Sequence, residues 1–157
     1  MITELKEHNY VIDYIRNTLS KFSSQISSDK MPKLLKLNTI SHLNTKIKAT
    51  INKNYDVFDI LYKMHPTPAV AGFPKQVSLD KIFSLENHDR GWYGGPLGWV
   101  DNKSNANFIV GIRSGIINNK DLYIYAGCGI IESSIPDKEF IESELKFDYI
   151  LSILKNE

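Results

Sequence analysis

The segment from His65 to Pro74 constrains the fold more than any other, because three of its ten residues are prolines and one is a glycine. Each proline fixes φ near about −65° and removes a backbone donor, and it pushes the residue before it toward an extended conformation. Gly72 can adopt backbone angles that other residues avoid. We predict a preformed loop, which serves either as a rigid crossover or as a surface that presents backbone groups to a ligand.

Length and charge limit the class of protein. The chain has 157 residues, enough for one domain of ordinary size. Its 19 basic and 18 acidic residues nearly cancel, so nothing points to a nucleic acid or an anionic membrane as a partner. No apolar run reaches the ~20 residues of a membrane span, and residues 1–8 lack the apolar core of a signal peptide. We expect a single domain over residues 1–157.

Cys128 is the only cysteine, which excludes an intrachain disulfide and suits the reducing cytosol. We therefore expect a cytoplasmic protein. Cys128 lies between two glycines at the end of an apolar strand pattern. We interpret it as a small buried filler rather than as a nucleophile.

Hydrophobic periodicity predicts an α+β fold. Helices are predicted over residues 3–22, 56–63 and 137–154, and from Pro74 at a first helical position to about Glu86. One or two strands are predicted within 34–51, and three more over 91–101, 107–118 and 121–131. Turn-forming residues join the last three strands, so we expect an antiparallel meander there. Residues 20–31 are polar and serine-rich and are predicted to be a loop.

Two of these helices each carry a pair of glutamates one turn apart, Glu4 with Glu7 and Glu139 with Glu142. The first pair lies either in a frayed first turn, where the helix dipole favours acidic residues, or at a functional site. Glu139, Glu142 and Lys146 share one face of the last helix. That helix is apolar over most of its circumference, so it is predicted to be buried on more than one side. Its polar face then lines a cleft, or else Glu142 and Lys146 form a surface pair worth about 0.3–0.5 kcal/mol.

Arg113 lies in the middle of an apolar strand pattern. An arginine in such a strand needs either an anionic partner or an exposed face, and both interpretations stay open.

The two glutamate pairs offer carboxylate oxygens and no nitrogen or sulfur ligand. Ligands of this kind suit a hard cation, Mg²⁺ in particular.

These motifs occur in a fixed order, which can be followed along the printed sequence. In that order they are His65–Pro74, Asp89–Gly95, Gly98–Val100, Ile112–Ser114, Tyr125–Ile130 and Glu139–Lys146. The set resembles the C-terminal portion of the chorismate-utilising enzymes, and of isochorismate synthase above all. The resemblance extends more weakly back to Glu4–His8. It implies the C-terminal half of the anthranilate-synthase-like fold, an antiparallel sheet flanked by helices.

The resemblance also implies a site for chorismate and Mg²⁺. By position, Glu7 and Glu142 match direct metal ligands, and Glu4 and Glu139 match an outer pair that acts through water. The metal would join these glutamates to the ring carboxylate of chorismate. The substrate-binding residues implied by the resemblance are Thr67, Val70, Tyr93, Arg113, Gly127 and Lys146.

Each of these substrate residues has its own implied role. Arg113 would bind the carboxylate of the enolpyruvyl arm, since a guanidinium matches a carboxylate bidentately, and Tyr93 lines the same end. The backbone of Gly127 lies against the substrate, and Lys146 lies near both substrate and metal. Thr67 and Val70 cover the ring, and the Pro-Thr-Pro-Ala form of their loop resembles isochorismate synthase more than salicylate or anthranilate synthase.

The implied reaction converts chorismate to isochorismate. Water adds at ring C2 while the C4 hydroxyl leaves, which requires a general base and a general acid. The family's base, a lysine, and its acid, a glutamate, have no match in this chain, so none of its residues is assigned a catalytic role. Losing one such group costs about 10²–10⁴-fold in rate, and we expect little activity from this chain alone.

Several alternatives therefore stay open. The chain is either part of an isochorismate synthase, a non-catalytic chorismate- and Mg²⁺-binding module, a subunit of a split enzyme, a relic, or part of a salicylate or anthranilate synthase. Without the rest of the family's core, we expect an exposed apolar face larger than a few hundred Å². An N-terminal half chain or self-association would cover that face. The pathway, menaquinone or siderophore biosynthesis, stays open with a lean toward menaquinone.

Overall fold

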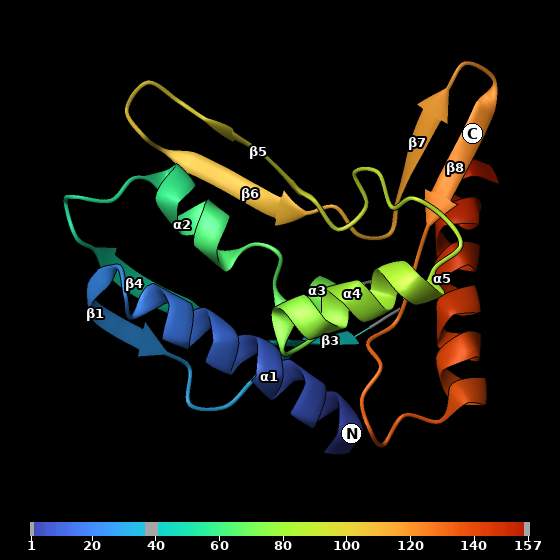
Figure 1. Cartoon of the computed structure of the whole chain (residues 1–157), viewed down its shortest axis with the longest axis horizontal. Helices are drawn as coiled ribbons and strands as arrows, with labels where there is room; N and C mark the ends of the chain where they lie inside the picture. Colours follow the sequence, from blue (N-terminus) through green and yellow to red (C-terminus); the bar gives the residue numbers. More distant parts are fainter. Residues whose placement is uncertain (1, 37–40, 156–157) are drawn as a thin grey trace. The chain divides into compact units, whose positions relative to one another are not determined.

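The computed structural model describes residues 2–36 and 41–155, without the side chains of 2, 3 and 155. The chain divides into two compact units, Met1–Ala69 and Val70–Glu157, which we call the N-terminal unit and the C-terminal unit. Helices and antiparallel two-stranded sheets occur in both units (Figure 1), which confirms the predicted α+β class. The single domain over residues 1–157 stays a prediction, because two compact units can belong to one domain.

The N-terminal unit is organised around α1 (Ile2–Leu19), which packs against strand β1 and helix α2. The apolar stripe of α1 ends in buried Leu19, and a turn then brings buried Phe22 edge-on to the ring of Tyr55 at 4.8 Å. The helix ends three residues earlier than predicted because the amides of Lys21 and Phe22 bond to carbonyls only three residues before them. A tighter turn of this kind commonly ends an α-helix.

The four strands of the N-terminal unit form two antiparallel pairs. Strand β1 (Ser23–Ser28) pairs with β4 (Ile47–Ile51), and β2 (Lys33–Lys36) pairs with β3 (Ser41–Asn44). The predicted loop over 20–31 is therefore wrong. Its serine-rich sequence forms a strand because the partner β4 satisfies its backbone groups, a tertiary effect that overrides local preference. Strand structure within 34–51 is confirmed, but the described residues form three strands there rather than the predicted one or two. Residues 37–40 lie outside the described residues.

Helix α2 (Val57–Met64) confirms the predicted short helix and has a capping box at its start. The Asp56 carboxylate accepts hydrogen bonds from the amides of Phe58 and Asp59, and the Asp59 carboxylate accepts one from the amide of Asp56. This reciprocal arrangement satisfies backbone donors that the helix leaves unpaired. The helix ends at His65, which precedes the first proline and is extended.

The proline-rich segment contains one helical turn, α3 (Pro68–Ala71), and leads into α4 (Lys75–Leu85). Pro74 is the residue before α4 rather than its first helical residue, because its ψ of 138° is extended. Gly72 has φ +70°, and a Cβ on it would lie 2.6 Å from the Cβ of Ser78. The loop therefore requires glycine at this position, both for its backbone angle and for the close approach of α4.

The C-terminal unit has two hairpins rather than the predicted three-stranded meander (Figure 1). Strand β5 (Pro96–Val100) pairs with β6 (Ala106–Val110), and β7 (Ser114–Asn118) pairs with β8 (Asp121–Tyr125). The expected middle strand is interrupted because Gly111 bonds back to Gly94 and Gly95. Arg113 then has φ +48°, a backbone angle that cannot continue a strand.

Helix α5 (Pro136–Lys155) confirms the predicted last helix, and strand β8 packs against it. The prediction that α5 is buried on more than one side is wrong for the described chain. Its large apolar side chains are mostly exposed, namely Phe140, Ile141, Leu145, Tyr149, Leu151, Ile153 and Leu154. Helix α5 therefore presents much of its apolar surface to solvent in the described chain.

The whole chain exposes more surface than its size predicts. Its accessible area is 12178 Å², against about 8,000 Å² for one folded protein of this mass or about 9,700 Å² for two separate ones of half the mass. Among the described residues, the buried apolar side chains are Leu19, Phe22 and Ala71. Many large apolar side chains are exposed, and the expected single apolar face of more than a few hundred Å² stays a prediction. None of the described helices is both long and apolar enough to cross a membrane.

We predict that Gly72→Ala destabilises the chain more than Gly91→Ala. Both glycines have positive φ, which costs an alanine about 1–2 kcal/mol, but the nearest atom to a Cβ on Gly91 is 3.8 Å away. The clash with Ser78 adds about 1–3 kcal/mol of overpacking to Gly72→Ala alone. Urea unfolding followed by circular dichroism measures both losses, and equal losses would contradict the close approach.

Candidate functional site

Lys146 on α5 contacts one predicted substrate residue and one predicted metal ligand. Its ammonium donates a hydrogen bond to the carbonyl oxygen of Gly127 at 2.8 Å and lies 2.6 Å from a carboxylate oxygen of Glu142. The Lys146 side chain is only 18% exposed, whereas that of Glu142 is 54% exposed. Helix spacing places the lysine one turn after the glutamate, so the pair presents a fixed positive charge beside an accessible carboxylate.

Tyr93 also lies beside Gly127. Its hydroxyl is 3.1 Å from the position that a Cβ on Gly127 would occupy, and its ring stacks on Tyr125 at 5.5 Å. Burial raises the pKa of Tyr93 above that of a free phenol. The hydroxyl therefore stays protonated at neutral pH and can donate a hydrogen bond to a ligand.

Glu139 and Glu142 lie close enough to Cys128 to influence it. The thiol of half-buried Cys128 contacts the backbone carbonyl of Glu139 at 3.4 Å. Burial raises the pKa of the Cys128 thiol, and the negative charges of Glu139 and Glu142 add to this effect. The residue remains a thiol at neutral pH, which agrees with our interpretation that it is not a nucleophile.

A hollow of about 360 Å³ lies between the start of α5 and the segment that follows β8. It is lined mostly by apolar groups. The lining residues are Cys128, Ile130, Ser134, Pro136, Glu139, Phe140 and Ser143. Its volume lies at the lower end of the range for small-molecule pockets.

Arg113 lies in the bend between β6 and β7 rather than in the middle of a strand, as its position in the sequence had suggested. The side chain is half-buried. Its positive charge acts against the rise of the Tyr93 pKa, which places the two residues near each other. In the part of the chain that the structure describes, no carboxylate forms an ion pair with Arg113. The guanidinium is therefore available to an anionic ligand.

The proline-rich loop contributes its two predicted residues to different units. Thr67 is half-buried in the N-terminal unit. Val70 begins the C-terminal unit, where its carbonyl accepts a hydrogen bond from Arg90 at 2.7 Å. A Cβ on buried Gly94 would lie 3.5 Å from the Cβ of Val70, so this end of the loop packs closely on the turn before β5.

The predicted metal ligands are likewise divided. Glu4 and Glu7 lie on α1 in the N-terminal unit, and Glu139 and Glu142 lie on α5 in the C-terminal unit. Within residues 2–36 and 41–155, no cluster of three or more histidine, cysteine or acidic side chains could hold a metal ion. Each glutamate pair nevertheless fits Mg²⁺ in its donor chemistry, because it provides carboxylate oxygens only. The four-carboxylate magnesium site stays a prediction.

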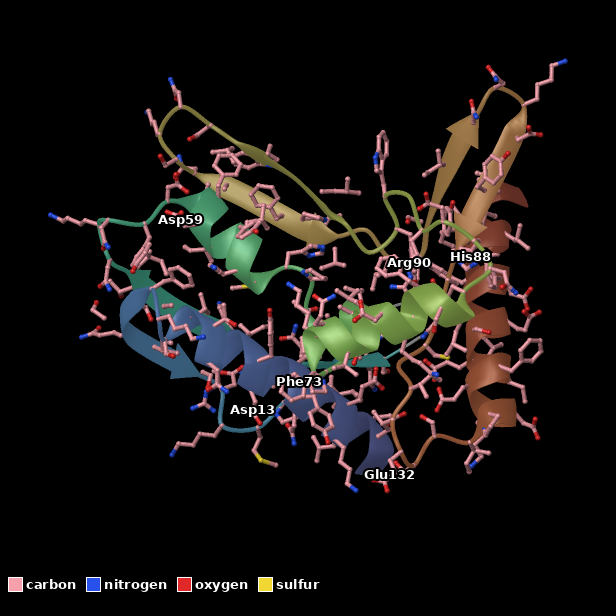
Figure 2. All side chains as sticks on the ribbon, viewed as in Figure 1. Asp13, Asp59, Phe73, His88, Arg90 and Glu132 are labelled. Carbon is pink, nitrogen blue, oxygen red and sulfur yellow. The ribbon has the colours of Figure 1, made fainter. Side chains whose placement is uncertain are left out.

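Sequence analysis missed Arg90 and Glu86. Figure 2 shows Arg90 and His88 in the segment after α4. The Arg90 guanidinium donates from Nε to one oxygen of Glu86 at 2.7 Å and from Nη2 to the other at 2.5 Å. The spacing of four residues was the available signal, but α4 ends at Leu85, so helix periodicity did not predict the pair.

The comparisons with known proteins decide the family. The sequence profile described as chorismate binding enzyme matches residues 3–155. The chain belongs to the chorismate-binding enzyme family. This membership confirms the resemblance drawn from the motifs and accounts for their fixed order.

Curated members of the chorismate-binding family include isochorismate synthases that are similar to this chain. Isochorismate synthase MenF of Bacillus subtilis is 37% identical over 153 residues, which are 98% of this chain and 32% of that protein. The salicylate biosynthesis isochorismate synthase of Pseudomonas aeruginosa is 40% identical over 140 residues, 89% of this chain and 29% of that protein. The chain thus spans about a third of the length of these relatives.

Solved structures of family members agree with the fold. The 2,3-dihydroxybenzoate-specific isochorismate synthase DhbC of Bacillus anthracis matches with a TM-score of 0.91 and 30% identity, over 96% of this chain and 40% of that chain. Anthranilate synthase component I of Streptococcus pneumoniae matches with a TM-score of 0.85 and 26% identity, over 93% and 34%. The predicted similarity to the anthranilate-synthase-like fold is confirmed.

The Glu86–Arg90 pair gives a testable pH dependence. The hydrogen bond from Arg90 lowers the pKa of Glu86 below the ordinary value of 4.5, so the folded state favours the ionised carboxylate. The stabilisation is present above pH 4.5 and is lost as the pH falls through the lower folded value. We expect Glu86→Gln to flatten the decline of unfolding free energy from about pH 5 to 3.

Glu144→Gln is the matched control, because it removes an exposed carboxylate of α5 with the same change in charge. Urea unfolding at a series of pH values measures both variants. A Glu86→Gln profile as steep as that of the wild type would contradict the assigned ion pair.

Proposed function

We propose that this chain is the chorismate- and Mg²⁺-binding portion of an isochorismate synthase. One observation carries the proposal: the Lys146 ammonium lies within bonding distance of both the Gly127 carbonyl and the Glu142 carboxylate, with the Tyr93 hydroxyl beside Gly127. These residues come from three separate segments. The names of the relatives support the substrate class.

The two carboxylates of chorismate would be held at different places. Arg113 is half-buried and has no carboxylate partner among the described residues, so its guanidinium can receive the enolpyruvyl carboxylate through two parallel hydrogen bonds. Tyr93 remains a neutral donor near that group. Lys146 would hold a positive charge at the ring while its bond to Gly127 orients the backbone on which the ring rests.

Both pairs of glutamates would take part in holding the metal. Glu7 and Glu142 would bind Mg²⁺ directly, and Glu4 and Glu139 would act through water. When bound, the ion supplies the positive charge that draws the ring carboxylate toward these side chains. Lys146 offsets part of the negative charge of the four glutamates through its ion pair with Glu142, and a divalent ion would offset two further negative charges.

We propose that turnover needs protein segments in addition to this chain. The relatives are about three times as long as the matched segment, and no residue of this chain matches the family's general base or general acid. The apolar surface of α5 is exposed, and an N-terminal family half would cover it.

We also propose that the protein is cytoplasmic, because the Cys128 thiol stays reduced in that compartment.

A second candidate function is a binding module that holds chorismate and Mg²⁺ without converting them. The same observation supports it, because the contacts around Gly127 provide for ligand binding and assign no group to proton transfer. A salicylate or anthranilate synthase activity is a third candidate, supported by the structural match to anthranilate synthase component I. The Pro-Thr-Pro-Ala sequence of the loop favours isochorismate synthase.

The deciding experiment measures products from chorismate and Mg²⁺ by chromatography, for the chain alone and for the chain mixed with a family N-terminal half. Isochorismate from the mixture only is the expected result. Isochorismate from the chain alone would place an acid and a base among its own residues and contradict our assignment. Binding without product in either sample would support the binding module.

We predict that Arg113→Ala weakens chorismate binding about 10- to 100-fold, because hydrogen bonds to charged groups contribute about 1.5–3 kcal/mol. Calorimetric titration with Mg²⁺ present measures the affinity. Arg16→Ala removes an exposed arginine of α1 and serves as the control. A loss below twofold for Arg113→Ala would reject the assignment.

We predict that Glu142→Gln raises the Mg²⁺ concentration needed for chorismate binding about tenfold or more, whereas Glu144→Gln leaves it unchanged. Metal ligands must be deprotonated, so binding by the wild type should also weaken as the pH falls through the carboxylate range. Titration with Mg²⁺ at fixed chorismate measures both effects. An unchanged metal dependence of Glu142→Gln would exclude it as a ligand.

A further inference from the structure

Arg90 bonds to two separate segments of the C-terminal unit, the residue after α4 and the proline-rich loop. Its Nε and Nη2 groups donate to both oxygens of Glu86, and its Nη1 group donates to the carbonyl of Val70 at 2.7 Å. The side chain is only 22% exposed, and that of Glu86 is 30% exposed. The guanidinium therefore joins the end of α4 to the proline-rich loop in one plane.

The same guanidinium also lies over an aromatic ring. Its central carbon is 5.8 Å from the centre of the Tyr93 ring, and a cation in this position attracts the face of the ring. A backbone hydrogen bond also joins these two residues, because the Tyr93 amide donates to the Arg90 carbonyl at 2.8 Å. Tyr93 also stacks on Tyr125 in a nearly parallel arrangement. Arg90 thus helps to set the position of a ring whose hydroxyl lies beside Gly127.

A purely stabilising role would need only the contacts to Glu86. The bond to the Val70 carbonyl and the contact with Tyr93 both lead instead to residues of the proposed chorismate site. A lysine at this position could keep the charge and the pairing with Glu86. It could not bond to Glu86 and Val70 with the planar fork of arginine.

We propose that Arg90 is a positioning residue, which holds the Val70 carbonyl and the Tyr93 ring in the geometry that binds a dicarboxylate ligand. The inference rests on the proposed function for the ligand, and on contacts within the C-terminal unit for the geometry. Arg90 does not touch the ligand in this proposal. It acts through Val70 on one side and through Tyr93 on the other.

The test compares Arg90→Lys and Glu86→Gln with the wild-type chain. Glu86→Gln keeps Arg90 but weakens its anchor, so it tests the proposal even if Arg90→Lys does not fold. Asp56→Ala is the control, because it breaks the capping box of α2 and lowers stability without touching Arg90. Calorimetry with chorismate and Mg²⁺ gives affinity, and thermal unfolding gives stability.

We expect Arg90→Lys to bind chorismate about tenfold or more weakly and Glu86→Gln to be intermediate, while Asp56→Ala binds like the wild type despite its lower melting temperature. If affinity followed melting temperature across all three variants, Arg90 would be a stabilising residue only. Binding by Arg90→Lys within twofold of the wild type would also overturn the proposal.

A readout without ligand separates this proposal from the proposed function. Tyrosine ring signals in a nuclear magnetic resonance spectrum of ¹³C-tyrosine-labelled chain can be assigned to Tyr93 by their loss in Tyr93→Phe. We expect Arg90→Lys to move the Tyr93 signals and Asp56→Ala to leave them in place. Unmoved Tyr93 signals would reject the positioning role. Moved signals in a chain that binds no chorismate would reject the proposed function alone.

Discussion

The Arg90 guanidinium connects three segments of the C-terminal unit. It bonds to Glu86 at the end of α4 and to Val70 in the proline-rich loop, and it lies over the ring of Tyr93. Because the ion pair is partly buried, water competes only weakly for its hydrogen bonds. From Tyr93 the contacts continue to Gly127 and then to Lys146 on α5. One line of polar and aromatic contacts thus connects the loop, a hairpin and the last helix.

This arrangement relies on polar contacts because the described chain has little apolar core. Few side chains are buried, and the accessible area exceeds even that of two separate folded proteins of half the mass. Hydrophobic burial is usually the main favourable term in folding, so polar and aromatic contacts take a larger share in holding the described elements together.

Much of the fold could be predicted from local sequence. The helices that begin near Asp56 and Pro136 follow from capping residues and apolar periodicity, and both were found within about two residues. Strand β1 could not be predicted, because serine has no strand preference of its own and depends on pairing with β4. The break at Gly111 and Arg113 was missed for a similar reason: it is defined by hydrogen bonds to Gly94 and Gly95, far away in the sequence.

The sequence by itself determined the family, because the order and spacing of its motifs can be read without any knowledge of the fold. It also determined which residue types are available to bind a dicarboxylate and a hard cation. The tertiary structure alone decided that Lys146 bonds to Gly127 and that Arg90 links Val70 to Tyr93. Such contacts join residues 19 and 20 positions apart across different elements. Helix and strand periodicity places residues only within one element, so contacts between elements emerge only once those elements are packed.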